Sequence, residues 1–168
     1  MAGQQKPAQV AFRIHFIYRL FFLVVEPISA LVGAYYSHFR QETYLNLLNS
    51  DSAPSPDAGS APLATSVAMS QLANMFLFFA LNEALVLRST ADLRVWRTVL
   101  FVLLLADVGH LYSMRELGAS IYWDFAGWNV SDLGNVPWVY VGMTMRLCFL
   151  AGFGLGESRA LKRKDWKS

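Results

Sequence analysis

Three ionisable residues lie within long apolar stretches of the sequence: Glu26, Asp107 and Arg146. Ionisable side chains in such stretches usually face the interior of a helix bundle or a water-filled cavity, and they mark functional sites. If both carboxyls ionised beside one guanidinium, a net negative charge would remain in apolar surroundings, so one acid is expected to hold its proton. A protonated acid beside an ionised base, bridged by an arginine, is suited to acid/base chemistry on a neutral lipophilic molecule.

Four apolar segments must position these residues. The chain of 168 residues is 55% hydrophobic and only 15% charged, which is more apolar than an ordinary soluble domain. Each segment is long enough to cross ~30 Å of hydrocarbon at 1.5 Å per residue. The sequence therefore predicts an all-α membrane protein, a single domain built as a bundle of four transmembrane helices. The helices are expected at about residues 14–38, 64–87, 96–114 and 136–156.

The basic residues predict the orientation of this bundle. Of the 14 lysines and arginines, these lie on one side: Lys6, Arg13, Arg19, Arg88, Arg94, Arg97, Arg159, Lys162, Arg163, Lys164 and Lys167. Because basic residues are retained on the cytosolic side, both termini are predicted to be cytosolic. The Ser/Ala/Pro/Asp-rich segment 49–62 is expected to be a flexible loop, and residues 115–135 an aromatic loop on the lumenal side.

Depth in the bilayer connects the three ionisable residues. Counted from the cytosolic end of each predicted helix, Glu26 lies about 18 Å in, Asp107 about 17 Å and Arg146 about 15 Å. They are therefore expected to meet near the midplane. Pro27 directly follows Glu26 and should disturb the helix there, freeing backbone carbonyls.

Other polar residues are candidates for orienting a substrate or a water molecule. Asn74 counts to about 20 Å in the second helix, and His110 lies one turn from the acid of the third. Asn82 and Glu83 lie about 7 Å from the cytosolic edge, where Glu83 could pair with the arginine five residues later or reach inward. Tyr35 could also orient a nucleophile.

Several site types have little support in the sequence. Cys148 is the single cysteine, which excludes an intrachain disulfide. His15, His38 and His110 are far apart, so no metal site is expected, and no cofactor motif is present. The basic segment 162–167 is too short to imply nucleic acid, and it is more simply a topology anchor with some attraction to anionic lipid.

Two stretches of the chain carry a resemblance. Residues 21–39 (FFLVVEPISALVGAYYSHF), the Leu-Asn-Glu of 81–83 and the four-segment layout resemble small, mostly uncharacterised fungal four-helix membrane proteins, some associated with secondary-metabolite pathways. The resemblance implies an endoplasmic-reticulum setting and a tailoring step on a polyketide or meroterpenoid. More distantly, the chain looks like the emopamil-binding sterol isomerases and the membrane terpene cyclases. The carboxyl and arginine grouping is similar in chemistry to limonene-type epoxide hydrolases, whose fold is unrelated.

The leading hypothesis is a membrane-embedded enzyme that opens an epoxide of a lipophilic substrate, with Glu26, Asp107 and Arg146 as catalytic residues. Terpene cyclisation or sterol-type isomerisation is the enzymatic alternative. The sequence is also compatible with a protein that has no catalytic function: a lipid- or sterol-binding protein, a scaffold or a transporter subunit. In a further alternative, the charged residues form an ion pair that only fixes the helix register. The expected partners are a lipophilic small molecule and membrane lipid, with a homo-oligomer or pathway enzymes as further options.

Overall fold

The computed structural model of the protein describes residues 12–55 and 61–157. The centre of the predicted flexible loop 49–62 lies outside the described residues. So do the basic residues at both ends of the chain, Lys6 and the group from Arg159 to Lys167.

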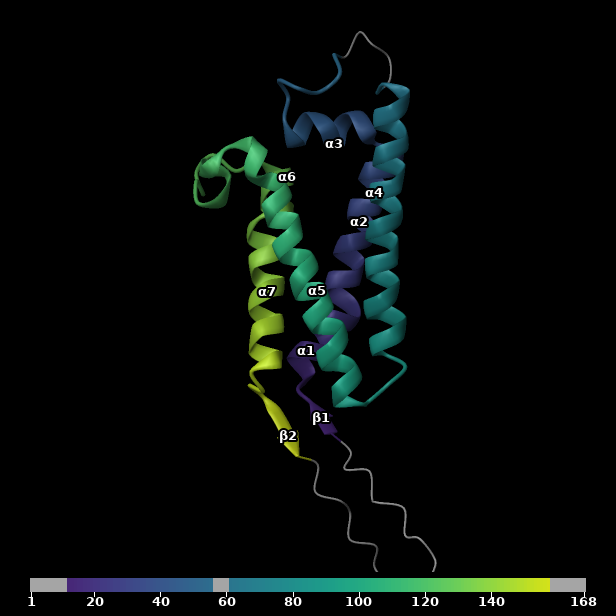
Figure 1. The fold of residues 1–168 in the computed structure, drawn as a ribbon, viewed down its shortest axis with the longest axis vertical. Coiled ribbons are helices and arrows are strands. Elements are labelled where there is room, and N and C mark those ends of the chain that lie inside the picture. Colours follow the sequence, from purple (N-terminus) through teal and green to yellow (C-terminus); the bar gives the residue numbers. More distant parts are fainter. Residues whose placement is uncertain (1–11, 56–60, 158–168) are drawn as a thin grey trace, which may run out of the picture.

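The N-terminal half forms two long helices and one short one (Figure 1). The first long helix is continuous from Phe16 to Phe39 and consists of α1 (Phe16–Leu20), the π-helical turn η1 (Phe21–Val25) and α2 (Glu26–Phe39). The second consists of α4 (Leu63–Leu81) and the π-helical turn η3 (Asn82–Leu87). Between them, α3 (Gln41–Leu48) lies across one end of the bundle, in a stretch for which no helix was predicted.

The C-terminal half contributes two further helices that run along the bundle. These are α5 (Leu93–Ser113) and α7 (Pro137–Leu150). Asp92 caps α5, because its carboxylate accepts a hydrogen bond from the backbone N–H of Arg94 at 2.7 Å. The predicted lumenal loop 115–135 is partly helical. It contains η4 (Met114–Leu117), η5 (Ala119–Tyr122) and α6 (Val130–Asn135).

The prediction that the fourth helix continues to residue 156 is wrong. The helix ends at Leu150, and Gly152 and Gly154 then adopt positive φ angles of 88° and 68°. This left-handed conformation costs glycine little and ends a helix. The chain continues as β2 (Leu155–Glu157), which pairs antiparallel with β1 (Phe12–Ile14). This ribbon was not predicted. Because β1 includes Ile14, the first helix begins at Phe16 and not at residue 14 as predicted.

Within residues 12–55 and 61–157, three helices are long and apolar enough to cross a membrane: Phe16–Phe39, Leu63–Leu87 and Leu93–Leu117. The prediction of a mainly helical protein with membrane-spanning segments is confirmed to this extent. The 14 residues of α7 correspond to about 21 Å, less than the ~30 Å of a hydrocarbon core.

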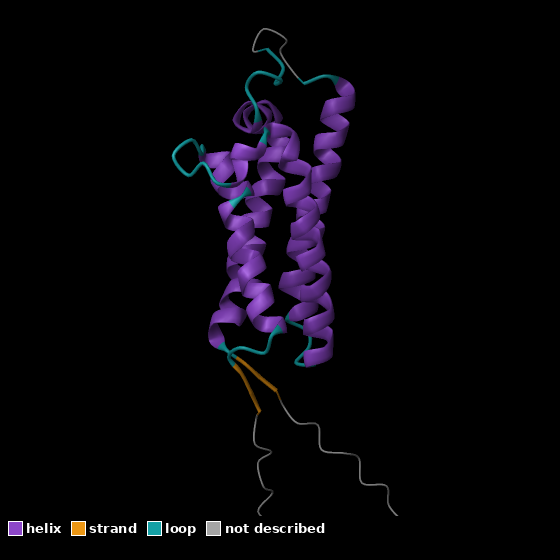
Figure 2. Cartoon of the chain, turned by 60° about the vertical axis from the view of Figure 1, so that its left-hand side comes forward, coloured by secondary structure: helices purple, strands orange, loops and turns teal. Residues whose placement is uncertain are grey.

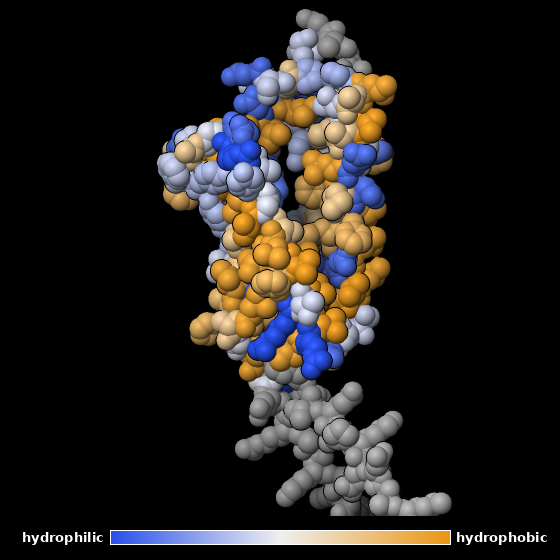
Figure 3. Space-filling model, viewed as in Figure 1, coloured by the Kyte–Doolittle hydropathy of each residue, from blue (hydrophilic) through white to orange (hydrophobic). Residues whose placement is uncertain are grey.

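The long helices associate as two pairs, α2 with α4 and α5 with α7 (Figures 1 and 2). The pairs meet near the β1–β2 end, where Phe149 packs edge-on against Tyr18 and stacks with Trp96 at ring distances of 5.2 and 5.7 Å. At the opposite end α3 contacts α6. Between these two contacts the surface is hollowed, as the space-filling view in Figure 3 shows.

Candidate functional site: a buried arginine with three carboxylates

Arg146 of α7 is at the centre of the buried charges. Its Nη1 donates a hydrogen bond to Asp107 Oδ2 at 2.8 Å. Its Nη2 donates to Glu26 Oε1 at 2.7 Å and to Glu83 Oε1 at 3.2 Å. Four helical segments, η3, α2, α5 and α7, thus each supply one side chain to what we call the charge cluster: Glu26, Glu83, Asp107 and Arg146.

The four members of the charge cluster differ in accessibility. The side chains of Arg146 and Glu83 are 0% exposed, whereas those of Glu26 and Asp107 are 7% and 9% exposed. Among the described residues, three buried polar atoms of the cluster have no hydrogen-bond partner: Glu26 Oε2, Glu83 Oε2 and Arg146 Nε. A buried polar atom without a partner is costly, so these atoms are sites where a proton, a water molecule or a ligand would be stabilising.

The local sequence explains how Glu26 is held. Pro27 has no N–H, so the carbonyl four residues earlier, that of Leu23, loses its helical partner. The chain widens to a π-helical turn just before Glu26, and Arg88 Nη2 donates to the Leu23 carbonyl at 2.8 Å. The expectation that Pro27 disturbs the helix and frees a carbonyl is confirmed.

Glu83 also lies in a π-helical turn, η3, and η3 packs against η1. Two of the three carboxylates are therefore at or beside a π-helical turn, a feature that is rare and often located at functional sites. Glu83 reaches inward to Arg146, which settles the choice that the sequence left open between this orientation and pairing with Arg88.

The guanidinium fits closely into its surroundings. Its Cζ lies 5.6 Å from the ring centroid of Phe22 and 5.5 Å from that of Phe79, distances at which a cation is attracted by an aromatic face. Gly142, one turn before Arg146 on α7, leaves room for the guanidinium because it has no side chain. A Cβ at this position would lie 2.6 Å from Arg146 Nη1 and 3.1 Å from Glu26 Oε1.

The structure brings Glu26, Asp107 and Arg146 together, as predicted, although α7 ends at Leu150 and Arg146 therefore lies nearer its helix end than the count assumed. It adds Glu83 as a fourth member. Because the carboxylates all converge on one guanidinium, they do not form an open ligand set, and no metal-binding group of histidine, cysteine and acidic residues is present in the described ranges. Chemically, the cluster contains carboxyl groups that can donate or accept a proton, next to a guanidinium that provides a fixed positive charge.

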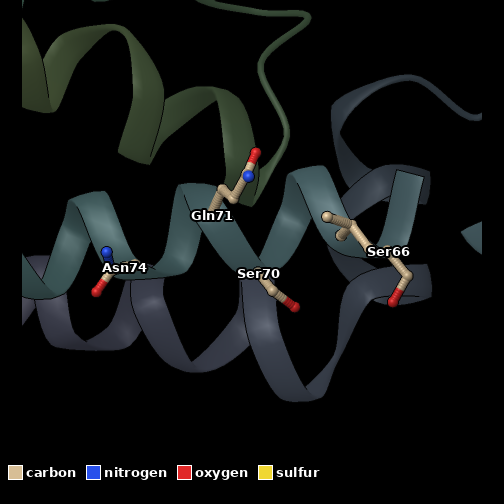
Figure 4. A pocket seen from close by; sticks show the side chains of 5 residues that line it. Ser66, Ser70, Gln71 and Asn74 are labelled. Atoms are coloured by element: carbon tan, nitrogen blue, oxygen red, sulfur yellow. The ribbon is translucent and has the colours of Figure 1, made fainter. Parts of the chain in front are cut away.

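Asn74 of α4 was predicted to orient a substrate or a water molecule at the site. The structure instead places it away from the charge cluster. Asn74 precedes Glu83 by nine residues, about two and a half helical turns, so it lies on the opposite side of α4. It is exposed, and it lines an open pocket on the outer surface of that helix. Figure 4 shows the side chains that line this pocket and labels Ser66, Ser70, Gln71 and Asn74.

Three further candidates also lie outside the charge cluster. Tyr35 follows Glu26 by nine residues and is 50% exposed, again on the opposite side of its helix. A nitrogen of the His110 ring lies 3.1 Å from the backbone carbonyl of Asn135, so the ring links α5 to α6. Asn82 donates to the carbonyl of Phe78 within its own helix at 2.9 Å. The predicted orienting roles of these residues are not supported by their contacts.

Fold and site together describe a mainly helical protein with helices long and apolar enough to cross a membrane, whose interior holds a compact group of opposite charges. The chain belongs to the family described as "Domain of unknown function (DUF7704)", which matches residues 11–156. This membership agrees with the resemblance to a mostly uncharacterised family. No curated protein and no solved structure matches the chain.

Proposed function

We propose that the protein is an integral-membrane biosynthetic enzyme that opens an epoxide on a lipophilic substrate by acid/base catalysis. One observation carries the proposal: three carboxyls share a single buried guanidinium, and only Glu26 and Asp107 have part of their side chains accessible. These two are therefore the carboxyls that would contact a substrate, while Glu83 and Arg146 would hold their geometry.

Charge counting supports acid/base chemistry. Three ionised carboxylates beside one guanidinium would leave a net charge of about −2 in apolar surroundings, which is unfavourable. Two protons on the carboxyls would neutralise the charge cluster. In that state it contains both proton donors and a proton acceptor within reach of one another, which is the combination that epoxide opening requires.

In the proposed reaction one accessible carboxyl protonates the epoxide oxygen as the C–O bond breaks. The other takes a proton from a water molecule whose oxygen forms the new bond to carbon. The product is a diol, and one molecule of water has been added. The first carboxyl has lost a proton and the second has gained one, so transfer between them through the cluster restores the starting state. If an internal hydroxyl replaces water, the product is a cyclic ether of unchanged mass.

The hollow between the two helix pairs supports access for a lipophilic molecule. It lies between the α3–α6 contact and the level at which η1 and η3 pack together (Figures 1 and 3). Because it opens sideways between helices, we propose that substrate enters from the bilayer and places its epoxide at the accessible edges of Glu26 and Asp107.

The same pair of groups would serve proton-initiated terpene cyclisation or double-bond isomerisation, which is the alternative enzymatic function. The complete burial of Glu83 and Arg146 favours this alternative in one respect, since a site poor in water protects a carbocation. A protein that only binds a lipid or sterol would need the hollow but no proton transfer.

We also propose four membrane crossings with both termini in the cytosol of a fungal cell, in the endoplasmic reticulum. Two observations support the topology. β1 pairs with β2, so both ends of the described chain lie together, and the turn that carries Arg88 lies at the same end of the bundle (Figure 1). The short α7 would complete the fourth crossing with help from its flanking residues.

The test of this function is product analysis in oxygen-18 water. Microsomes that contain the protein are incubated with polyene and prenyl epoxides, and microsomes that lack it serve as the control. A product with one labelled water supports the hydrolase, and a new product of unchanged mass supports cyclisation or isomerisation. Substrate that binds with high affinity yet returns unchanged would overturn an enzymatic function in favour of binding.

A further inference from the structure

The outer face of α4 carries two amide side chains that the charge cluster does not use. Gln71 and Asn74 are both exposed, on the side of the helix that faces away from α2 and from Glu83. Within the described part of the chain, neither amide has a hydrogen-bond partner, whereas neighbouring Ser70 accepts a hydrogen bond from Gln41 at 3.4 Å. This face therefore has unsatisfied polar groups without an intramolecular reason.

Depth makes this exposure significant. Asn74 lies thirteen residues from Leu87, the end of the spanning helix, so it is about 20 Å from that edge, and Gln71 is about 24 Å from it. Both positions fall within a hydrocarbon core of ~30 Å. Polar side chains at such depth are usually directed at another helix, because lipid offers no hydrogen bonds.

We infer that this face of α4 binds the same face of a second copy of the chain. A carboxamide contains both a donor and an acceptor, so it is complementary to another carboxamide. Two copies inserted in the same direction are related by a two-fold axis along the membrane normal, which brings each Asn74 opposite its counterpart. The small side chains of Ser66 and Ser70 line the same pocket and border this face on the side of Gln41, where they leave room for a neighbouring helix.

The shape of the surface fits such a contact. The pocket beside the two amides has a volume of about 310 Å³ and is lined by Ser66, Val67, Ser70, Gln71 and Asn74. A groove of this size receives side chains of a neighbouring helix. The inference does not depend on the proposed chemistry, because the charge cluster lies on the opposite side of α4.

Disulfide trapping in native membranes tests the inference. In a Cys148→Ser background, Val67→Cys places a single cysteine on this face, at a side chain that is 51% exposed. Oxidation is expected to produce a covalent dimer. Adding Asn74→Leu should reduce the dimer fraction about tenfold, the effect of losing one or two interhelical hydrogen bonds. The matched control is Leu105→Cys on α5, which is 56% exposed and should give no dimer.

The inference is overturned if Val67→Cys gives no dimer, if Leu105→Cys is trapped equally well, or if the cross-link joins a different protein. Undiminished trapping in the presence of Asn74→Leu would equally contradict it. Photobleaching of the wild-type sequence, fluorescently labelled in lipid nanodiscs, provides a measurement that needs no substitution: two steps per particle are expected, and a single step would refute the dimer.

Discussion

Replacing Gly142 by alanine is a sensitive test of how the charge cluster is packed. In most helices this change stabilises the protein by ~1 kcal/mol, because alanine has the higher helix propensity. At Gly142 the new Cβ would lie 2.6 Å from Arg146 Nη1 and 3.1 Å from Glu26 Oε1. Real Cβ atoms do not approach other atoms to 2.6 Å, so the guanidinium must move.

The expected magnitude follows from the bonds that this movement disturbs. Arg146 makes hydrogen bonds of 2.7 and 2.8 Å to Glu26 and Asp107. A hydrogen bond to a charged group contributes about 1.5–3 kcal/mol, so losing one outweighs the gain in helix propensity. Gly142→Ala should lower the free energy of unfolding by about 0.5–2 kcal/mol, which corresponds to about 1–8 °C in melting temperature.

Thermal unfolding followed by tryptophan fluorescence in a mild detergent measures this effect. The matched control is Gly109→Ala in α5, where a Cβ would meet no atom within 4 Å, and this variant is expected to be slightly more stable than the wild type. If Gly142→Ala is stabilised as much as Gly109→Ala, the tight placement of the guanidinium is wrong.

Two further predictions concern contacts outside the charge cluster. Arg88→Gln removes the donor to the Leu23 carbonyl and should lower the unfolding free energy by about 1 kcal/mol. Arg97 is exposed, so Arg97→Gln is the control and should leave the unfolding free energy unchanged. Equal melting temperatures of the two variants would argue against the role of Arg88. Asn129 caps α6 through its side-chain oxygen and donates from Nδ2 to the Leu47 carbonyl of α3 at 2.8 Å. Asn129→Ala, which loses both contacts, should cost about 1–2 kcal/mol, and Asn129→Asp, which keeps the cap, clearly less; identical melting curves would contradict this division.

Much of the charge cluster was predictable because depth along a helix follows from counting residues. Glu26 and Asp107 counted to similar depths, and the structure places both on one guanidinium. Glu83 was ranked lower because Arg146 was expected ten residues from the end of its helix. The helix ends at Leu150, so Arg146 lies only about 6 Å from the end of its helix. Glu83 lies at the same distance, about 6 Å, from the end of its own helix.

Rotation about each helix axis was harder to predict than depth. Asn74 and Tyr35 were chosen by depth or residue type, yet each lies nine residues from a cluster carboxylate, a spacing that puts it on the opposite side of the helix. Periodicity could have excluded both. The β1–β2 ribbon and α3 were not predictable by these means, because short elements depend on contacts between distant segments, such as that of Asn129 with Leu47.

The most direct test of the central claim is turnover by the Asp107→Asn variant, measured together with its melting temperature. The wild type is expected to incorporate oxygen-18 from water into an epoxide-derived product. The variant should remain folded and lose at least about 100-fold in rate, since a general acid or base contributes about that much or more. A folded Asp107→Asn protein that forms labelled product at the wild-type rate would contradict the claim that this cluster performs the chemistry.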